Sequence, residues 1–321
     1  MQHRTSSHLI RNIIILLVLF LMTCGIFFGV TRYMSIKKAV NSSFNTAGLI
    51  KKRNTSKQLN DKKPISVLLL GIDTGEFGRN YRGRTDSIMI VTIDPQKHKT
   101  TITSIPRDTA VTISGFSKQS PSKINAAYSW GKAKTTIMTV QNMLNIPIDF
   151  YVLINMGGME KVINKIGGVD ITPTLSFTYS GYSFKKGEKT HMNGKKALAY
   201  SRMRYDDPEN DYGRQKRQRS VLMALVNKSA SMSTLVDKGL ISSLTKQIQT
   251  DISFDDIMRL AKSYRSSNDN VNETHLQGDE KKLNGQSMEV MRRSELQRTT
   301  NFIRNGLGLP HKKTGSIAIY R

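Results

Sequence analysis

The stretch ISVLLLGID, residues 65–73, decides the fold of this chain. It is apolar almost throughout and closes on Gly71 and Asp73. A short continuous apolar run of this kind is typical of a strand that is buried on both faces at the centre of a sheet. Such a strand needs partner strands beside it and helices over its two faces. Residues 65–73 therefore predict an α/β domain that is built around them.

The sequence on either side supplies the other layers of that domain. Apolar and β-branched runs predict strands at 87–94, 100–105 and 149–155, and a short one near 274–276. Helical spacing of apolar residues predicts helices at 128–144, 159–166, 194–201, 212–229, 233–247, 254–264 and 287–305. Together these elements predict a mixed α/β domain whose central sheet lies between helices.

The N-terminal part contains an apolar run of eighteen residues, 13–30, about the shortest stretch that spans a bilayer as a helix. A cleavable signal peptide would have an apolar core of about 7–15 residues followed by a small-x-small site. Here the run continues as TRYMSIKK, so we predict an uncleaved anchor. The predicted organisation is a short cytoplasmic tail (1–11), a transmembrane signal anchor (12–31), a linker or stalk (32–63), a folded domain (64–310) and a basic tail (311–321).

Two further features of composition narrow the possible functions. The sole cysteine, Cys24, lies inside the apolar run, which excludes a disulfide framework and thiol catalysis for the rest of the chain. The net charge is +25, from 49 Lys and Arg against 24 Asp and Glu, which suits a nucleic acid, an anionic lipid or an anionic wall polymer. The sequence contains no helix-turn-helix, zinc-finger or RNP pattern. Composition alone does not separate these three partners, and charges on both sides of residues 13–30 leave the orientation open.

The richest cluster of cations is YSRMRYDDPENDYGRQKRQR, residues 200–219. Arg202 and Arg204 are two apart, so in an extended segment they point the same way. After the breaker Asp207-Pro208, Asp211 is placed to cap a helix, whose N-terminus favours phosphate. The alternative is that such a charge run is a solvated helix face.

The predicted helix after Asp211 continues this pattern. Arg214 and Gln218 lie four apart on one face, and the same face then becomes apolar at Val221 and Leu222. A charged head followed by an apolar stripe suits a lipid that carries a phosphate, although apolar residues of this kind are most often ordinary core. We expect Lys216, Arg217 and Arg219 to form a solvated face.

Two carboxylates and three cations accompany the first strands. Asp73 ends the first strand and Asp86 opens the second, and two carboxylates with phosphate oxygens and water make a typical Mg²⁺ site. The alternative is that each aspartate only caps a turn.

Arg84 and Arg107, the latter at the end of the third strand, are suited to bidentate phosphate contact. Lys123 precedes a helix. The alternatives are an Arg107–Asp108 ion pair and a surface lysine. No Ser-His-Asp pattern is visible, so the residues favour phosphoryl transfer.

Eight motifs in register carry a resemblance to a known family. They are LLLGID, RTDSIMI, SIPRD, KINAAY, IDFYVLIN, INKIGGVDI, MNGKKALAYSRMR and DYGRQKRQR. This order is similar to that of the LytR-CpsA-Psr family of membrane-anchored cell-wall glycopolymer ligases, over about residues 65–226. The resemblance implies an α/β/α sandwich around a mixed, mostly antiparallel central sheet, with one N-terminal transmembrane helix and an extracytoplasmic domain (single-pass, type II).

The resemblance also implies the reaction. Family members move a polymer such as teichoic acid or capsule from undecaprenyl pyrophosphate to peptidoglycan, and they make a phosphodiester with Mg²⁺. The implied partners are the polyprenyl-pyrophosphate-linked glycopolymer, peptidoglycan and the cytoplasmic membrane, and no nucleic acid is expected. Two alternatives stay open, namely a membrane-bound transcriptional attenuator and a polyprenyl-pyrophosphate hydrolase.

Residue roles follow by matching motif positions. Asp73 and Asp86 would bind the metal, and Asp211 would orient an arginine or help to deprotonate the acceptor hydroxyl. The pyrophosphate would be held by Arg84, Arg107, Lys123, Arg202, Arg204, Arg214 and Gln218. Arg107, Arg204 and Asp211 are the implied catalytic residues. The chain departs from the family in carrying Thr74-Gly75 where many members have an arginine, and Gly131-Lys132 where a glycine pair is common.

Overall fold

The computed structural model describes residues 31, 33–72, 83–204, 206–229, 245, 247–264 and 270–319. Nearly all of the predicted anchor, 12–31, and the predicted metal ligand Asp73 lie outside these residues, as do Thr74-Gly75 and most of the predicted helix 233–247. None of the described helices has both the length and the apolar character that crossing a bilayer requires.

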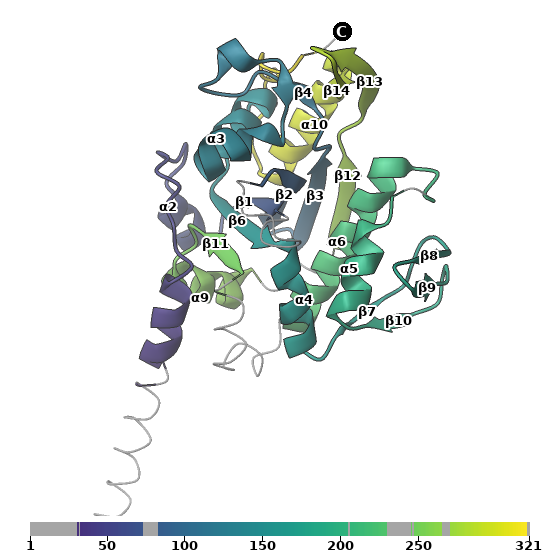
Figure 1. Cartoon of the computed structure of the whole chain (residues 1–321). Coiled ribbons are helices and arrows are strands. Elements are labelled where there is room, and N and C mark those ends of the chain that lie inside the picture. Colours follow the sequence, from purple (N-terminus) through teal and green to yellow (C-terminus); the bar gives the residue numbers. More distant parts are fainter. Residues whose placement is uncertain are drawn as a thin grey trace, which may run out of the picture.

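The centre of the fold is a six-stranded mixed sheet in the order β11-β6-β1-β2-β3-β12 (Figure 1). Neighbours β1–β2, β2–β3 and β6–β11 are antiparallel, whereas β1–β6 and β3–β12 are parallel. The strands are β1 (Ile65–Ile72), β2 (Thr85–Asp94), β3 (Lys99–Ile105), β6 (Phe150–Asn155), β11 (Ile248–Thr250) and β12 (Asn270–His275). Strand β1 is buried along almost its whole length, so the prediction made from ISVLLLGID is confirmed.

Helices cover both faces of this sheet (Figure 1). On one face, Leu68 and Ile90 belong to the largest apolar cluster, together with α3 (Ala126–Leu144) and α10 (Arg293–Gly306). Helix α10 approaches closely, because a Cβ at Gly306 would lie 2.4 Å from the Thr92 hydroxyl. The opposite face carries α2 (Thr55–Asn60), α9 (Phe254–Ser263) and Leu222 of α6 (Asn210–Ser229). The alternation of side chains along each strand divides the core between these two faces.

A second apolar cluster lies beside the sheet, where α4 (Met156–Lys165) and α5 (Gly194–Arg202) pack with α6. Phe177, Phe184 and Tyr200 form an aromatic group with ring centroids 4.7–5.8 Å apart. Two short antiparallel strand pairs, which the sequence did not predict, carry or adjoin these residues. These are β7 (Val169–Ile171) with β10 (Thr190–Met192), and β8 (Phe177–Tyr179) with β9 (Tyr182–Phe184). This cluster packs against the second half of α6, at Val221 and Leu225.

Segments outside the predicted domain, 64–310, pack on it. Arg53 makes an ion pair with the buried Asp149, and the Tyr151 hydroxyl donates to the Asn45 carbonyl at 2.9 Å. Beyond residue 310, Ala318 is buried and its segment pairs with β4 (Ala110–Val111). The expected linker and basic tail therefore both contact the core, and a soluble form for experiments should begin well before residue 64.

The predicted final helix, 287–305, is wrong in its first part. Residues Gln286–Met291 form β14, which pairs antiparallel with β13 (Gly278–Leu283), and α10 begins only at Arg293. Asn284 and Gly285 join the two strands with φ angles of 50° and 74°. Positive φ at both central residues is the signature of a type I′ hairpin turn, for which Asn-Gly is the preferred pair. The turn makes residues 286–291 the second strand of a hairpin, so the helix begins later than the sequence predicted.

Replacing Lys132 with glycine is expected to stabilise the fold. Lys132 has φ 58° and ψ −156° at a kink in α3, a region that is essentially restricted to glycine and costs of order 1–3 kcal/mol otherwise. The greater freedom of glycine in the unfolded chain offsets part of that gain, by roughly 0.5–1 kcal/mol. We expect urea unfolding to show a net increase of about 1 kcal/mol for Lys132→Gly. Lys134→Gly, in regular helix, should instead lose about 1 kcal/mol, and a loss at both positions would contradict the strain.

Candidate active site

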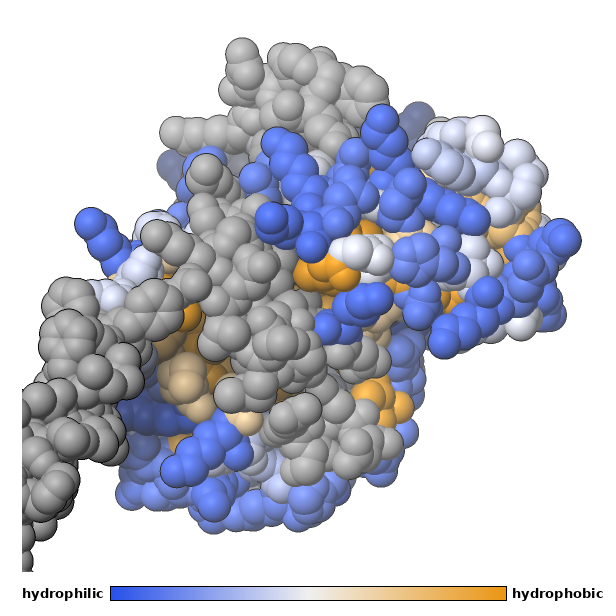
Figure 2. Space-filling view, turned by 90° about the horizontal axis from the view of Figure 1, so that it is seen from below, coloured by the Kyte–Doolittle hydropathy of each residue, from blue (hydrophilic) through white to orange (hydrophobic). Residues whose placement is uncertain are grey.

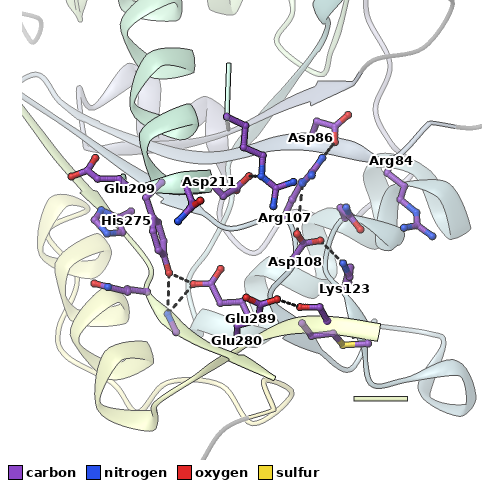
Figure 3. A pocket seen from close by; sticks show the side chains of 18 of the residues that line it. Arg84, Asp86, Arg107, Asp108, Lys123, Glu209, Asp211, His275, Glu280 and Glu289 are labelled. Atoms are coloured by element: carbon purple, nitrogen blue, oxygen red, sulfur yellow. Dashed lines mark hydrogen bonds and ion pairs between the residues drawn. The ribbon is translucent and has the colours of Figure 1, made fainter. Parts of the chain in front are cut away.

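A cavity of about 950 Å³ opens between the ends of several elements (Figure 3). Its walls come from the start of β2, the segment after β3, strand β5 (Ser122–Lys123), the start of α6 and the β13–β14 hairpin. One side of the cavity carries cations and the other side carries carboxylates and a tyrosine. Of the predicted site residues, the cavity brings together Arg84, Asp86, Arg107, Lys123, Arg204 and Asp211.

Arg107 lies in the middle of the cationic side, between Asp86 and Asp108 (Figure 3). Its Nη1 donates to Asp86 Oδ1 at 2.5 Å, while its Nε lies 3.7 Å from Asp108 Oδ2. Lys123 Nζ pairs with the other oxygen of Asp108 at 2.9 Å. Burial acts to lower the pKa of Arg107, but Asp86, Asp108 and Asp211 outweigh it and raise the pKa. The expected Arg107–Asp108 pair is thus the longer of two, and Arg107 stays charged at any physiological pH.

Asp211 contacts two further arginines, Arg204 and Arg214. It lies in the first turn of α6, which begins at Asn210, so it does not cap the helix from outside as predicted. Arg214 Nη2 approaches Asp211 Oδ1 to 2.5 Å, and Arg204 Nε lies 4.0 Å from the same oxygen. Burial lowers the pKa of Arg214, and the charges of Arg107 and Arg204 add to this effect against the pull of Asp211. Asp211 therefore contacts two arginines, and its role in orienting them stays a prediction.

Buried guanidinium donors without a partner point to an anion. Among the described residues, Nε of Arg107 and Nε of Arg214 are buried and make no hydrogen bond. A buried donor left unpaired costs about 1–3 kcal/mol, and more when it is charged. Phosphate oxygens would supply the missing acceptors, and arginine forks suit their geometry. The cationic side of the cavity therefore has the charge and the free donors that an anion such as phosphate requires.

Three predicted phosphate ligands, Arg202, Arg214 and Gln218, do not line this cavity. Arg202 is the last residue of α5, and Gln218 is buried one turn beyond Arg214 on α6. Gln218 instead borders a narrow apolar crevice of about 20 Å³ with Leu222, Met89 and Ile154. One face of α6 thus runs from Asp211 to this crevice at Leu222, whereas Val221 of the predicted apolar stripe is buried in the second apolar cluster. Seen from below, apolar side chains show at the bottom of hollows between hydrophilic ones (Figure 2).

Sequence reasoning missed the acidic side of the cavity. Glu289 lies on β14, and its Oε1 accepts from the Tyr212 hydroxyl and from the Gly278 amide at 2.9 Å. Burial raises the pKa of Glu289, although these hydrogen bonds act against the rise, and burial also raises the pKa of Tyr212. The His275 ring packs on Tyr212 with centroids 4.8 Å apart. The Asn284-Gly285 turn was the available signal, because it would have revealed the hairpin that carries Glu289.

The predicted solvated face of α6 holds for only one residue. Lys216 is exposed and pairs with Glu209. Arg217, however, is buried, makes an ion pair with Asp207 and donates to the Met203 carbonyl at 2.5 Å. Arg219 is also buried and donates to Glu273 at 2.9 Å and to Ser104 at 2.7 Å. Residues 200–219 thus contain arginines that bind α6 to its neighbours, Arg217 and Arg219, as well as Arg204, which lines the cavity.

Comparison with known proteins agrees with this geometry. Residues 30–305 match the LytR_cpsA_psr family. The chain belongs to that family. It is 40% identical over 294 residues to the "polyisoprenyl-teichoic acid–peptidoglycan teichoic acid transferase TagU" of Enterococcus faecalis, an alignment that covers 91% of this chain and 95% of that protein.

Solved structures of family members have the same fold. A protein of Streptococcus agalactiae superposes with a TM-score of 0.73 at 34% identity and covers 84% of this chain and 96% of its own. Bacillus subtilis TagU superposes with a TM-score of 0.62 at 33% identity and covers 77% of this chain and 97% of its own. The α/β fold with a mixed central sheet is therefore shared with these relatives.

The carboxylates at the cavity are the groups that could hold the expected Mg²⁺. Among the described residues, no group of three or more His, Cys, Asp or Glu side chains is placed to hold a metal ion. Asp86 offers the cavity one carboxylate, of which Oδ1 is already paired with Arg107. Magnesium in phosphoryl-transfer sites takes only one or two carboxylates and completes its shell with phosphate oxygens and water. Asp86 is compatible with that role, and Asp73 as the second ligand stays a prediction.

Proposed function

We propose that this chain transfers a glycopolymer of the teichoic acid or capsule type from an undecaprenyl-pyrophosphate carrier to peptidoglycan. The names of its relatives describe a teichoic acid transferase that uses a polyisoprenyl-linked donor and a peptidoglycan acceptor. The observation that carries the proposal is the convergence of Arg107 and Arg204 on one cavity, with Arg214 paired to Asp211 of its wall and buried guanidinium donors left unpaired. Pyrophosphate accumulates negative charge as it departs, and fixed guanidinium groups stabilise that charge.

The residues around the cavity suggest the division of roles. Arg107 and Arg204 hold the phosphates, and Asp211 fixes the directions of Arg204 and Arg214. Arg84 and Lys123 add positive charge at the sides. Asp86, with Asp73, would hold a Mg²⁺ ion, which neutralises phosphate charge when it is bound. The apolar stripe of α6 leads away from the phosphates toward Leu222, and it supports a path for the isoprenoid, although the crevice there must widen to admit one.

The proposal includes a location. Residues 12–31 would anchor the chain as a single-pass type II membrane protein, with the domain outside the cytoplasmic membrane. The apolar run at 13–30 supports this, since it is long enough to span a bilayer. A cysteine accessibility test in intact cells, with one cysteine introduced near residue 312, distinguishes the two orientations. Labelling only after lysis would revive the transcriptional attenuator as the function.

Reconstitution tests the activity directly. The full chain in detergent, with Mg²⁺, a polyprenyl-pyrophosphate-linked teichoic acid and peptidoglycan fragments, should place labelled polymer on peptidoglycan. Release of polymer phosphate into solution with no transfer would favour the hydrolase. Asp86→Asn should lower transfer and weaken its dependence on Mg²⁺, and an unchanged Mg²⁺ titration would contradict Asp86 as a ligand.

A further inference from the structure

The β13–β14 hairpin places two glutamates side by side at the cavity. Glu280 and Glu289 are directly opposite each other in the antiparallel register, and both line the cavity. The backbone N–H of Glu289 donates to the Asp108 carbonyl at 2.8 Å, which brings the hairpin against the segment that carries Arg107. Like charges directly opposite on neighbouring strands destabilise a sheet. Two adjacent carboxylates are unusual in a chain of net charge +25, and their position at the cavity indicates a role in binding or catalysis.

The two oxygens of Glu289 have different surroundings. Oε1 receives both of its donors, the Tyr212 hydroxyl and the Gly278 amide. Oε2 receives no hydrogen bond from the described residues, and the carboxylate faces the open centre of the cavity (Figure 3). One oxygen therefore fixes the direction of the carboxylate, and the other is available to a ligand. A fixed carboxylate with a free oxygen is how a general base is held.

We propose that the hairpin β13–β14 forms the acceptor side of the cavity and that Glu289 is the general base that removes the proton from the acceptor hydroxyl. This inference rests on the proposed transferase function. It assigns to the acidic side of the cavity a hydroxyl-bearing sugar, while the cationic side holds the donor phosphates. Glu280, one strand away, is placed to accept hydrogen bonds from neighbouring sugar hydroxyls.

The proton and electron pairs balance in one step. The acceptor oxygen attacks the phosphorus next to the polymer while its proton passes to Glu289 Oε2. A new P–O bond forms, and the bond from that phosphorus to the bridging oxygen breaks. The leaving lipid phosphate takes the bond pair, and Arg107 and Arg204 stabilise its charge. Glu289 then returns the proton to solvent through the open cavity.

Asp211, the base suggested by the family resemblance, is less free to act. Its Oδ1 is held by Arg214 at 2.5 Å and its Oδ2 accepts from Gln215 at 3.1 Å. One oxygen is therefore in an ion pair and the other accepts a hydrogen bond, in both cases with a side chain of α6. The structure favours Asp211 as the residue that positions arginines and Glu289 as the residue that receives the proton.

The electrostatic surroundings of Glu289 raise its pKa above that of an ordinary glutamate. Burial raises its pKa, and the charges of Asp211 on α6 and Asp108 after β3 act in the same direction. The other groups around it are Tyr212 on α6, Glu280 on β13, Lys123 on β5 and His275 at the end of β12. Burial lowers the pKa of His275, and Arg219 and Lys216 add to that effect, so His275 is neutral near pH 7. A raised pKa makes Glu289 a stronger base than an ordinary glutamate.

The test is the pH dependence of transfer by the full chain, with a polyprenyl-pyrophosphate-linked teichoic acid and peptidoglycan fragments. For the wild-type protein, kcat/KM should rise with pH as Glu289 loses its proton. Glu289→Gln keeps an oxygen for Tyr212 and Gly278 but has no basic oxygen, so kcat/KM should fall by about 10²–10⁴-fold. The rise with pH should also disappear. Tyr212→Phe removes a hydrogen bond to the charged form and should move the rise to higher pH.

The outcomes separate the two proposals. Glu188→Gln is the matched control, because Glu188 is exposed in the turn between β9 and β10 and does not line the cavity. Melting temperatures check that each variant folds, and unchanged binding of inorganic pyrophosphate checks that the cationic side is intact. If the wild-type protein transfers and Glu289→Gln transfers within about threefold of it with the same pH profile, Glu289 is not the base. If the wild-type protein transfers no polymer at all, the proposed function itself fails.

Discussion

Arg107→Ala is expected to reduce kcat/KM for polymer transfer by about 10³-fold or more, since loss of one fixed donor to a developing anion costs about 10²–10³-fold and loss of an arginine at a phosphoryl group costs 10³–10⁵-fold. Arg107 is central among the cations, and its buried Nε has no hydrogen-bond partner among the described residues. Arg204→Ala should have a similar but smaller effect, because Arg204 is more exposed. Rates are measured at saturating and at limiting donor, so that kcat and KM are separated.

Arg107→Lys gives the sharper comparison. Lysine keeps the positive charge but cannot reach Asp86 and a phosphate in two directions at once. We expect it to recover at most a small part of the lost activity. Arg259→Ala, on the exposed side of α9, serves as the control for general loss of positive charge. Full transfer by Arg107→Ala with an unchanged melting temperature would remove Arg107 from the mechanism.

The second large effect concerns stability and the ion pair between Asp207 and Arg217. Both side chains are buried, and Arg217 also donates to the Met203 carbonyl and lies over the Phe177 ring. Removal of one partner of a buried pair leaves an uncompensated charge and costs about 3–5 kcal/mol. We therefore expect urea unfolding of Asp207→Ala to show a loss of this size. The double variant Asp207→Ala with Arg217→Met should recover much of it, because a neutral apolar side chain then fills the site.

Two controls distinguish this pair from the other charges of α6. Lys216→Ala removes an exposed pair with Glu209 and should cost less than about 1 kcal/mol. Gly213→Ala keeps every charge but adds a Cβ that would lie 1.8 Å from Asp207 Oδ2, so it should weaken the pair by displacing the carboxylate. Equal stability of Asp207→Ala and Lys216→Ala would mean that the buried pair contributes little. Because residues 203–211 carry Arg204 and Asp211, loss of the pair should also lower activity at temperatures where the fold persists.

The sequence predicted the parts of this molecule that local pattern controls. The apolar run of β1, the helical spacing of α3 and the order of the family motifs were sufficient to predict the layers and most of the cationic wall. They were sufficient because a strand buried on both faces, a helix of period 3.6 and a residue at a strand end can each be recognised from residues close together in the sequence. Asp86, Arg107 and Asp211 were found this way, and the cavity brings them together.

The remaining features depend on partners that are distant in the chain. Lys216 and Arg217 are adjacent in sequence, yet one is exposed and the other is enclosed by Asp207, Met203 and Phe177. The acidic side of the cavity was missed because its hairpin reaches the cavity through partners that are distant in the chain, the segment after β3 and Tyr212 on α6. Gln218 was assigned to phosphate by its motif position, and helical spacing placed it on the same face as Arg214. Spacing gives the face on which a residue lies but not what packs against it, and Gln218 borders the apolar crevice instead.

The carboxylates that hold the cations, Asp86, Asp108 and Asp211, have a consequence for selectivity. These aspartates already form ion pairs with the cations in the absence of a ligand. A small anion must therefore compete with the carboxylates for the same cations. A lone sulfate or orthophosphate gains little from that exchange. A diphosphate, with more oxygens and charge spread over two centres, can displace several of these contacts together. The cavity should therefore bind a diphosphate in preference to sulfate or orthophosphate.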